Sequence, residues 1–371
     1  MISFCKKCIM PNSRPRIVFN SDGVCNACIN GEEKIQINWD DRKKKFLELI
    51  KKIKKLKNTN QMYDCVVPWS GGKDSSAIAY KLKFEFGLNP LLVTFSPLII
   101  NEVGAYNREI LLEKGFDSIF VRPNQNVARK LAKRFFIERG NPKVAWDAGI
   151  NSAPVRVALN YKIPTVFYAE HGESEYGGLV LDEKSKIKRD LSEIVEHLVG
   201  DYPQNWASKD ISSKDLSAYI YPDEDDFKNF KVDPYYFSYF FKWSMLENYE
   251  FIKKNLPKFK KSQKRTDGTF TDFDSLDDKI DNLYYYMQFI KFGFGRATRD
   301  ACRMIQNNQM NREEAIELAR KYDNEFPQTN FEEVLNYLDI NRNQFDEIVN
   351  KHRNHEIWEI KNNQWKLKYQ I

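Results

Sequence analysis

The sequence lacks the features that mark several common classes of protein. No apolar run in its 371 residues approaches the roughly 20 residues that a membrane-spanning helix needs, and the best one, residues 91–100, stops at about ten. The first residues, MISFCKKCIM, have none of the long apolar stretch of a secretory signal peptide. We therefore expect a soluble, cytoplasmic protein without a membrane partner.

Strong charge asymmetry and abundant cysteine are also missing. Lys and Arg number 58 and Asp and Glu number 52, so the net charge of +6 is only mildly basic and is weak support for a nucleic-acid partner. The chain has 6 cysteines, and four of them fall within residues 1–28. A secreted disulfide scaffold would use them throughout a short chain. We interpret the cluster as a single local site in a protein of a reducing compartment.

The cysteine spacing predicts a metal site. Cys5 and Cys8 form one C-x-x-C pair, and Cys25 and Cys28 form a second pair sixteen residues later. Two such pairs can converge into a tetrahedral cage of four thiolates, the geometry that zinc accepts, and a filled cage predicts a structural rather than a catalytic ion. Two disulfides and a redox C-x-x-C pair are the alternative interpretations.

Alternating strand-like and helix-like patterns follow this cysteine-rich segment. This alternation predicts an α/β fold with a parallel sheet and right-handed crossovers. The expected strands are 63–69, 90–97, 118–123 and 164–170, and the expected helices are 74–86, 103–114, 125–139 and 152–161.

The texture of the chain predicts three regions. Residues 1–38 form a zinc ribbon, residues 39–200 form the α/β domain with a leading amphipathic helix at 39–58, and residues 201–371 form an aromatic-rich, mostly helical region for substrate and partner binding.

A glycine-rich motif, SGGKDSS at residues 70–76, lies between the first expected strand and its helix. Gly71 and Gly72 let the backbone approach an anion closely, and the following helix start adds partial positive charge. Lys73 supplies a point charge, while hydroxyls and one carboxylate serve phosphate oxygens and a bridging Mg²⁺. The polar side chains with these roles are Ser70, Asp74 (magnesium), Ser75 and Ser76. The motif is neither a Walker A loop nor G-x-G-x-x-G.

SGGKDSS resembles the PP-loop of the ATP pyrophosphatase superfamily, which includes GMP synthetase, NAD synthetase, asparagine synthetase and tRNA thiolation enzymes. The resemblance implies a Rossmann-like parallel sheet with ATP over the loop. It also implies that ATP is cleaved between its α- and β-phosphates, giving AMP transfer and pyrophosphate. It also implies that the adenine contacts the end of the next strand, at Thr94 and Phe95.

A narrower resemblance covers nearly the whole chain. The cysteine segment, the SGGKDSS loop, EHGESEYGG (170–178) and KFGFGRAT (291–298) occur in this order. This combination is similar to the N-acetyl sugar amidotransferase family of bacterial surface-polysaccharide and sialic-acid-like sugar biosynthesis. The family commonly has Gly-Glu-Asn where this chain has Gly172-Glu173-Ser174, so Ser174 replaces the Asn side chain of the family pattern.

The family resemblance implies a reaction and a set of site residues. Lys73 and Asp74 would be catalytic, and Gly172 would contact the nucleotide. Glu173 follows the end of an expected strand and is a further catalytic candidate, for holding the metal or taking a proton from ammonia, with a solvated loop carboxylate as the alternative interpretation. The acetamido oxygen of a nucleotide-activated N-acetyl sugar would be adenylated with ATP and Mg²⁺, and ammonia from a separate HisH-like glutaminase subunit would then give an acetamidino group. Weaker substrate-binding candidates are Glu175, Tyr176, Gly177, Gly178, Arg296 and Arg299, followed by Asp147, Gly149 and Asn151.

Two absences bear on the neighbouring functions. Cys65 and Cys302 are the only cysteines outside the cluster, and neither lies in a nucleophile-elbow pattern, so we expect no glutaminase activity in this chain. A tRNA thiolation enzyme generally needs further cysteines near its active site, so this alternative is less favoured. The other alternative is a non-catalytic zinc-ribbon RNA-binding protein, for which Lys6, Lys7 and two arginines of the ribbon are thin support.

Overall fold

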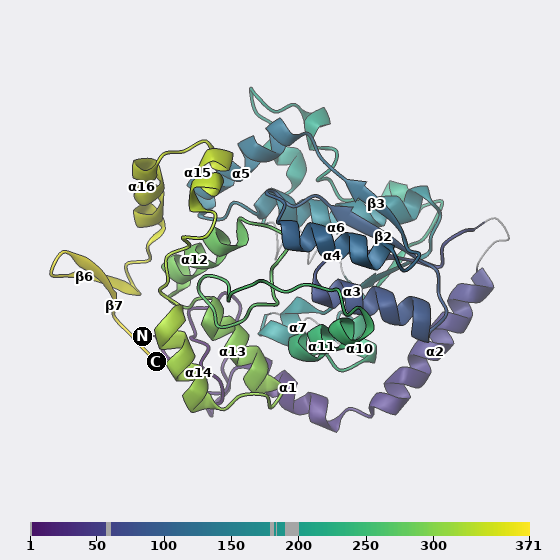
Figure 1. Ribbon diagram of the computed structural model, residues 1–371, viewed down its shortest axis with the longest axis horizontal. Coiled ribbons are helices and arrows are strands. Elements are labelled where there is room, and N and C mark those ends of the chain that lie inside the picture. The colour runs from purple at the N-terminus through teal and green to yellow at the C-terminus, as the bar shows by residue number, and fades with distance from the viewer. Residues whose placement is uncertain (1, 57–60, 179–181, 183, 190–199) are drawn as a thin grey trace.

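A five-stranded parallel sheet with the strand order β3-β2-β1-β4-β5 forms the centre of the computed structural model (Figure 1). The structure describes residues 2–56, 61–178, 182, 184–189 and 200–371. The strands are β1 (Cys65–Pro68), β2 (Pro90–Phe95), β3 (Asp117–Val121), β4 (Thr165–Tyr168) and β5 (Asp233–Tyr236). All four pairings between neighbours are parallel.

The inner strands are apolar on both faces, because helices cover both sides of the sheet. Val66, Val93 and Val166 point into one core, which is completed by the helices that follow β3. Val67 and Phe167 point into the opposite core. Strands that are buried on both faces usually have continuous apolar sequences, and CVVP of β1 and TVFY of β4 fit this pattern.

The crossover helices occupy the segments where the sequence predicts them, with shifted ends. They are α3 (Lys73–Tyr80) with its π-helical continuation η1 (Lys81–Glu85), α4 (Glu102–Leu112), α5 (Gln125–Arg139) and α6 (Val144–Asn160). The largest shift concerns α6, which begins eight residues before the expected start at 152. Asp147, Gly149 and Asn151 are therefore helical residues and not loop residues.

Short helices and a set of longer ones make up the rest. Around the sheet lie α7 (Gly172–Tyr176), η3 (Pro203–Trp206), η4 (Ser213–Leu216), α9 (Glu224–Phe227), α10 (Phe237–Phe240) and α11 (Met245–Asn255). The C-terminal part contains α12 (Asp281–Phe292), α13 (Arg296–Gln306), α14 (Arg312–Tyr322), α15 (Phe331–Leu338), α16 (Arg342–His352), β6 (Trp358–Lys361) and β7 (Gln364–Leu367). Near the N-terminus lie α1 (Asn26–Gln36) and α2 (Trp39–Leu56).

The expected fold class is confirmed, and two features differ from expectation. The fifth strand of the sheet, β5, comes from residues 233–236, so the sheet extends beyond the expected boundary at residue 200. Its pattern, DPYY, lacks a long apolar run because it is an edge strand. The mostly helical C-terminal region ends in the antiparallel pair β6–β7. Residues 57–58 of the leading helix and 190–199 before the expected boundary lie outside the described residues.

The strand order creates a topological switch point at the carboxyl ends of β1 and β4. β1 and β4 are neighbours, and the connection that follows β1 leads to β2 on one side, whereas the connection that follows β4 leads to β5 on the other side. Open α/β sheets bind ligands at such a point. The SGGKDSS motif follows β1 directly and therefore lies there.

The N-terminal cysteine segment packs against the C-terminal helices rather than standing apart. Its apolar residues share a core with Phe294, Ala301 and Ile305 from the segment that includes α13. In Figure 1 the purple N-terminal segment lies against α13 and α14. Among the described helices, none combines the length and the hydropathy that crossing a membrane requires.

Candidate active site

The loop after β1 has the backbone geometry of an anion-binding turn. Gly71 has φ +92, and a Cβ atom there would lie 2.6 Å from the Cγ of Arg108 and 2.7 Å from the carbonyl oxygen of Gly104. Only glycine fits this conformation and this close approach. Gly72 is the N-cap of α3, so the first N–H groups of the helix start beside the loop. Arg108 donates a hydrogen bond to the carbonyl of Ser70 at 3.0 Å and fixes the turn from behind.

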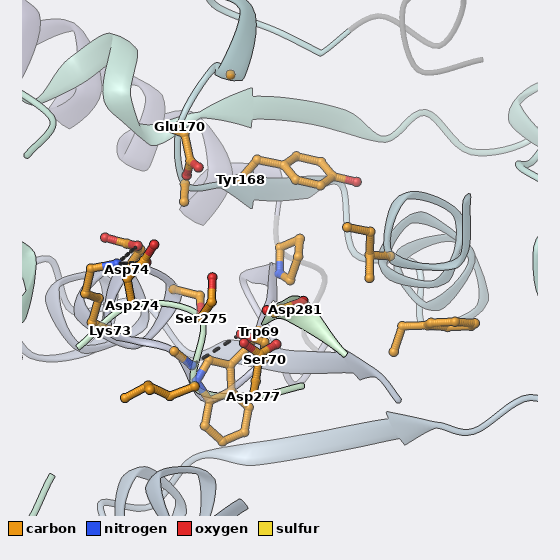
Figure 2. Close-up of a pocket in the computed structure, with 18 of the residues that line it drawn as sticks. Trp69, Ser70, Lys73, Asp74, Tyr168, Glu170, Asp274, Ser275, Asp277 and Asp281 are labelled. Atoms are coloured by element: carbon orange, nitrogen blue, oxygen red, sulfur yellow. Dashed lines mark hydrogen bonds and ion pairs between the residues drawn. The ribbon is translucent and has the colours of Figure 1, made fainter. Parts of the chain in front are cut away.

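The loop forms one wall of a cavity of about 490 Å³. The carboxyl ends of three strands contribute to its floor, including Pro68 of β1, Phe95 of β2 and Tyr168 of β4. Residues of the motif in the lining are Ser70, Gly72, Lys73, Asp74 and Ser75. Figure 2 shows Lys73, Asp74 and Asp274 side by side, with Glu170 facing them from the β4 side.

Lys73 is held by two carboxylates. It is 3% exposed, and its Nζ donates to Asp74 at 2.7 Å and to Asp274 at 2.5 Å. Burial alone lowers the pKa of Lys73, but Asp274 and Asp74 outweigh it, so the pKa lies above its ordinary value. Lys73 is therefore a buried, charged cation at the edge of the SGGKDSS loop (residues 70–76), which we call the phosphate loop after the ligand expected from the sequence.

Asp274 connects the loop to α13. Its second carboxylate oxygen accepts from Arg299 at 2.8 Å, and Arg296 donates to its backbone carbonyl at 2.7 Å. Burial raises the pKa of Asp274, yet Lys73 and Arg299 hold it well below the usual range. The ionised carboxylate thus joins a lysine and an arginine from distant parts of the chain.

Two further carboxylates face the phosphate loop. Asp74 accepts from the side-chain amide of Asn248 at 3.0 Å, and Glu170 accepts from the hydroxyl of Tyr176 at 2.9 Å. Burial is the main cause that raises the pKa of both Asp74 and Glu170. Oxygen ligands of this kind are what Mg²⁺ prefers, so these two residues fit a magnesium ion.

Three further aspartates, Asp147, Asp277 and Asp281, also line the cavity. Burial raises the pKa of Asp147 on α6 to about 7 and that of Asp277 to about 6. Asp281 forms an ion pair with the buried Lys143. Acids with raised pKa values in a cavity are typical of functional sites.

The structure does not bring every expected residue to the cavity. Ser76 is buried and its Oγ accepts from the indole of Trp69 at 2.9 Å, so it supports the loop from inside. Thr94 is buried and donates to the carbonyl of the same Trp69, while its neighbour Phe95 does line the cavity. Gly71 shapes the turn without lining the cavity.

The expectation for Glu173 needs a correction. Its carboxylate receives a hydrogen bond from Arg16 at 2.7 Å and does not line the cavity, whereas Glu170, three residues earlier, does. Glu175 is 7% exposed and forms an ion pair with Lys34. The five-residue helix α7 turns both side chains toward the N-terminal segment.

Of the remaining weak substrate-binding candidates, some line the cavity and others do not. Arg299 and Gly172 line the cavity, whereas Arg296 is buried behind it, with its guanidinium 4.8 Å from the ring of Tyr285. Tyr176 lies outside the lining and donates a hydrogen bond to Glu170, which is part of it. Gly177, Gly178, Gly149 and Asn151 lie outside the lining.

Sequence reasoning missed Asp274, Glu170, Lys143 and Asp281. Asp274 stands in a segment that the pattern indicates only as a loop, KSQKRTDGTFTDFD at 261–274. The only available signal is the acidic run DFDSLDDKID at 272–281, which also fits a solvated loop. Glu170 stands directly after a predicted strand, and its place at the strand end is a signal that could have found it.

The four N-terminal cysteines form a cage that fits a metal ion. Their ligand atoms all lie within 4.8 Å of one another, with Sγ–Sγ distances of 4.0 Å for Cys5–Cys28 and 3.7 Å for Cys8–Cys25. A tetrahedron with Zn–S bonds of about 2.3 Å has edges of about 3.8 Å. A disulfide needs about 2.05 Å, and all six cysteines are free. The N–H of Lys7 is one of the backbone donors to these sulfurs, as thiolates require.

Comparisons with known proteins give one family match. No curated protein matches the chain. A solved structure of a predicted subunit of a tRNA methyltransferase from Methanocaldococcus jannaschii is 20% identical over 37% of this chain, with a TM-score of 0.23, and the match spans 64% of that structure. The U34-tRNA thiolase NcsA from Methanococcus maripaludis, with its [4Fe-4S] cluster, is 13% identical over 83% of this chain and 88% of its own, with a TM-score of 0.27. At these scores neither structure informs the function.

The family model matches only the C-terminal part of the chain, which contains Arg299. Residues 267–371 match the C-terminal domain of LPS biosynthesis protein WbpG-like. This segment starts just before Asp274 and includes α12 to β7. The match supports the resemblance to surface-sugar proteins, because residues 267–371 are similar to the C-terminal domain of the WbpG-like LPS biosynthesis proteins.

Proposed function

We propose that this protein is an ATP-dependent amidotransferase of bacterial surface-sugar biosynthesis. Its substrate is a nucleotide-activated N-acetyl sugar, whose acetamido group becomes an acetamidino group with release of AMP and pyrophosphate. The observation that carries the proposal is the SGGKDSS loop with the buried Lys73 at the carboxyl edge of a parallel sheet, inside a cavity of about 490 Å³. The WbpG-like domain over residues 267–371 supports the sugar class.

The chemistry explains why ATP is needed. An amide carbon is a poor electrophile, and its oxygen is a poor leaving group. When the amide oxygen attacks the α-phosphorus of ATP, pyrophosphate leaves and an O-adenylyl imidate forms. Ammonia then attacks the carbon, and the C–O bond breaks as AMP leaves with the oxygen, giving an amidine after proton loss. The enzyme has to position the reactants and neutralise charge.

The residues of the cavity suit these two tasks. Lys73 and the first N–H groups of α3 neutralise the departing pyrophosphate. Asp74 and Glu170 would hold Mg²⁺, which would supply further positive charge to neutralise the phosphates. Arg299, now bound to Asp274, is near enough to the loop to serve a phosphate or a carboxylate of the sugar.

The ammonia source would be a separate glutaminase subunit. Cys65 is buried in β1, where burial raises the pKa of its thiol, and Cys302 is buried beside the cysteine cage. Neither lines the cavity, so neither is placed as a glutaminase nucleophile there. The same positions give no support to the alternative of a tRNA thiolation enzyme with active-site cysteines.

The test combines substrates and product analysis. The protein is incubated with ATP, Mg²⁺, ammonium and a panel of CMP- and UDP-linked N-acetyl sugars. We expect AMP, pyrophosphate and a sugar product lighter by about one mass unit, because oxygen is replaced by NH. Lys73→Ala should lower the rate about 100- to 1,000-fold, whereas Lys51→Ala on the exposed face of α2 should not. Formation of ADP and phosphate, or full activity of Lys73→Ala, would contradict the proposal.

A further inference from the structure

The N-terminal segment, defined here as residues 2–38, is fastened to α7 by contacts to its backbone. Arg14 donates to the carbonyl of Gly177 at 2.6 Å, and Asn26 donates to that of Gly178 at 2.9 Å. Asn30 donates to the carbonyl of Ser174 at 2.8 Å. These bonds satisfy carbonyl groups at the end of a helix, where the helix itself cannot.

Two ion pairs add to these bonds. Arg16 pairs with Glu173 at 2.7 Å, and Lys34 pairs with Glu175, whose side chains are 14% and 7% exposed. Glycine is required where the two parts meet, because a Cβ atom on Gly177 would lie 2.9 Å from Asn26. The contact between α7 and the N-terminal segment is therefore close, polar and specific.

The same segment also packs on α13. Cys8 and Ile9 share a buried core with Ala301 and Cys302 of α13. Arg312, at the start of α14, donates to the carbonyl of Cys8 at 3.2 Å. The same helix carries Arg299, which reaches Asp274 in the cavity.

Both helices deliver groups to the cavity. Gly172 of α7 and Glu170 just before it line the cavity, and Tyr176 of α7 bonds Glu170. Arg303 of α13 lies 3.6 Å from the ring of Tyr176, so the two helices also meet each other. An isolated five-residue helix is not stable in water, so α7 depends on its partners for its position.

We propose that the metal-binding N-terminal segment is a positioning element of the active site, which holds α7 and α13 so that Glu170, Gly172 and Arg299 face the phosphate loop. The segment contains little core of its own apart from the cysteine cage, so the metal would supply the rigidity that it transmits. The consequence for ATP rests on the proposed function, but the mechanical link between the segment and α7 does not.

This role competes with the interpretation of the segment as an RNA-binding ribbon. Arg14 and Arg16, two of its four candidate phosphate contacts, are bound to Gly177 and Glu173 of the same chain. Lys7 is paired with Glu32 within the segment. Cations that are already engaged in this way offer little to a phosphate backbone.

The test measures amide hydrogen exchange in the ligand-free full chain. The variant Asn30→Ala/Lys34→Ala removes one backbone bond and one ion pair to α7 without touching a cysteine. The matched control is Lys7→Ala/Glu32→Ala, an exposed ion pair inside the same segment. The amides of Glu175 and Gly178, which donate to His171 and Glu173, are the reporters.

We expect exchange over residues 170–178 to rise about tenfold or more in the first variant, which corresponds to about 1.4 kcal/mol, with unchanged zinc content and no change in the control. Arg16→Ala, which breaks the partly exposed pair with Glu173, provides a milder variant that should fold and show the same local effect. The single variant Lys34→Arg keeps the positive charge, so the amides of residues 170–178 should be as protected from exchange as in the wild type. Unchanged exchange over 170–178, or an equal rise in the control, would overturn the proposal.

A second arm separates this inference from the proposed function. The dissociation constant of ATP is measured with Mg²⁺ well below the melting temperature. We expect weaker binding by the first variant and normal binding by the control. If the wild type does not bind ATP, the proposed function fails while the exchange result still decides the positioning role. If ATP binds equally to all variants, the segment does not position the site.

Discussion

Lys73 of the phosphate loop bonds Asp274, a residue 201 positions later in the chain. Through the second oxygen of the same carboxylate, the loop is joined to Arg299 of α13. The carboxylate thus lies between a lysine that follows β1 and an arginine of the segment that matches the WbpG-like domain. The cavity is complete only when both parts of the chain are present.

Replacing Asp274 by Ala should strongly destabilise the protein. Lys73 is 3% exposed and would keep only Asp74, and Arg299 would lose one partner. Removing one partner of a buried ion pair costs about 3–5 kcal/mol. Urea unfolding measures the change, and Asp272→Ala in the same loop is the control, because its pair with the half-exposed Lys261 is worth about 0–1 kcal/mol. Equal, small effects of the two substitutions would show that Asp274 does not serve this role.

Gly71→Ala should distort the phosphate loop. The added methyl group would overlap Arg108 and the carbonyl of Gly104, and φ is +92. We expect a loss of about 2 kcal/mol or more in the free energy of unfolding and a large loss of ATP binding. Gly115→Ala is the control, since it has φ +82 but no atom within 4 Å of the new Cβ. The control should show only the backbone cost, about 1 kcal/mol, so an identical loss in both would argue against the close packing at Gly71.

Stability should fall as pH rises from about 4 to about 7. Burial raises the pKa of Asp147 to about 7, above its ordinary value near 3.9 in an unfolded chain. The folded state therefore binds more protons than the unfolded state in this window, so the free energy of unfolding decreases with rising pH and levels off above it. Asp147→Asn should flatten this part of a pH series of urea unfolding curves. Asp22→Asn, at an exposed position, should leave it unchanged.

Loss of one cage cysteine should release the metal. Cys25→Ser removes one of four thiolates, and we expect the zinc content to fall from about one ion per chain to near zero, with lower thermal stability. Cys302→Ser is the matched control, because Cys302 is buried against the cage without being one of its four members. Metal analysis of both purified variants distinguishes them. A variant at Cys25 that keeps its full zinc content would refute the cage.

Several features could be predicted from the sequence because their signals are local. The C-x-x-C pairs, the loop SGGKDSS and the four apolar strands are each written in consecutive residues. Short-range spacing therefore placed the cage, the phosphate loop and the parallel sheet. Glu173 shows the limit of such signals, because it and Glu170 both follow the same strand, and only the turn of α7 decides which one faces the cavity.

The sequence by itself determined the four-cysteine cage, the α/β class and the loop that turns between β1 and α3, because steric and spacing rules act over a few residues there. Only the tertiary structure decided that Asp274 pairs with both Lys73 and Arg299, and that β5, from beyond residue 200, forms an edge of the sheet. It also decided that the N-terminal segment contacts α7. These are encounters between residues far apart in the chain. They depend on which buried charges can compensate one another and which surfaces pack, and no local pattern encodes that choice.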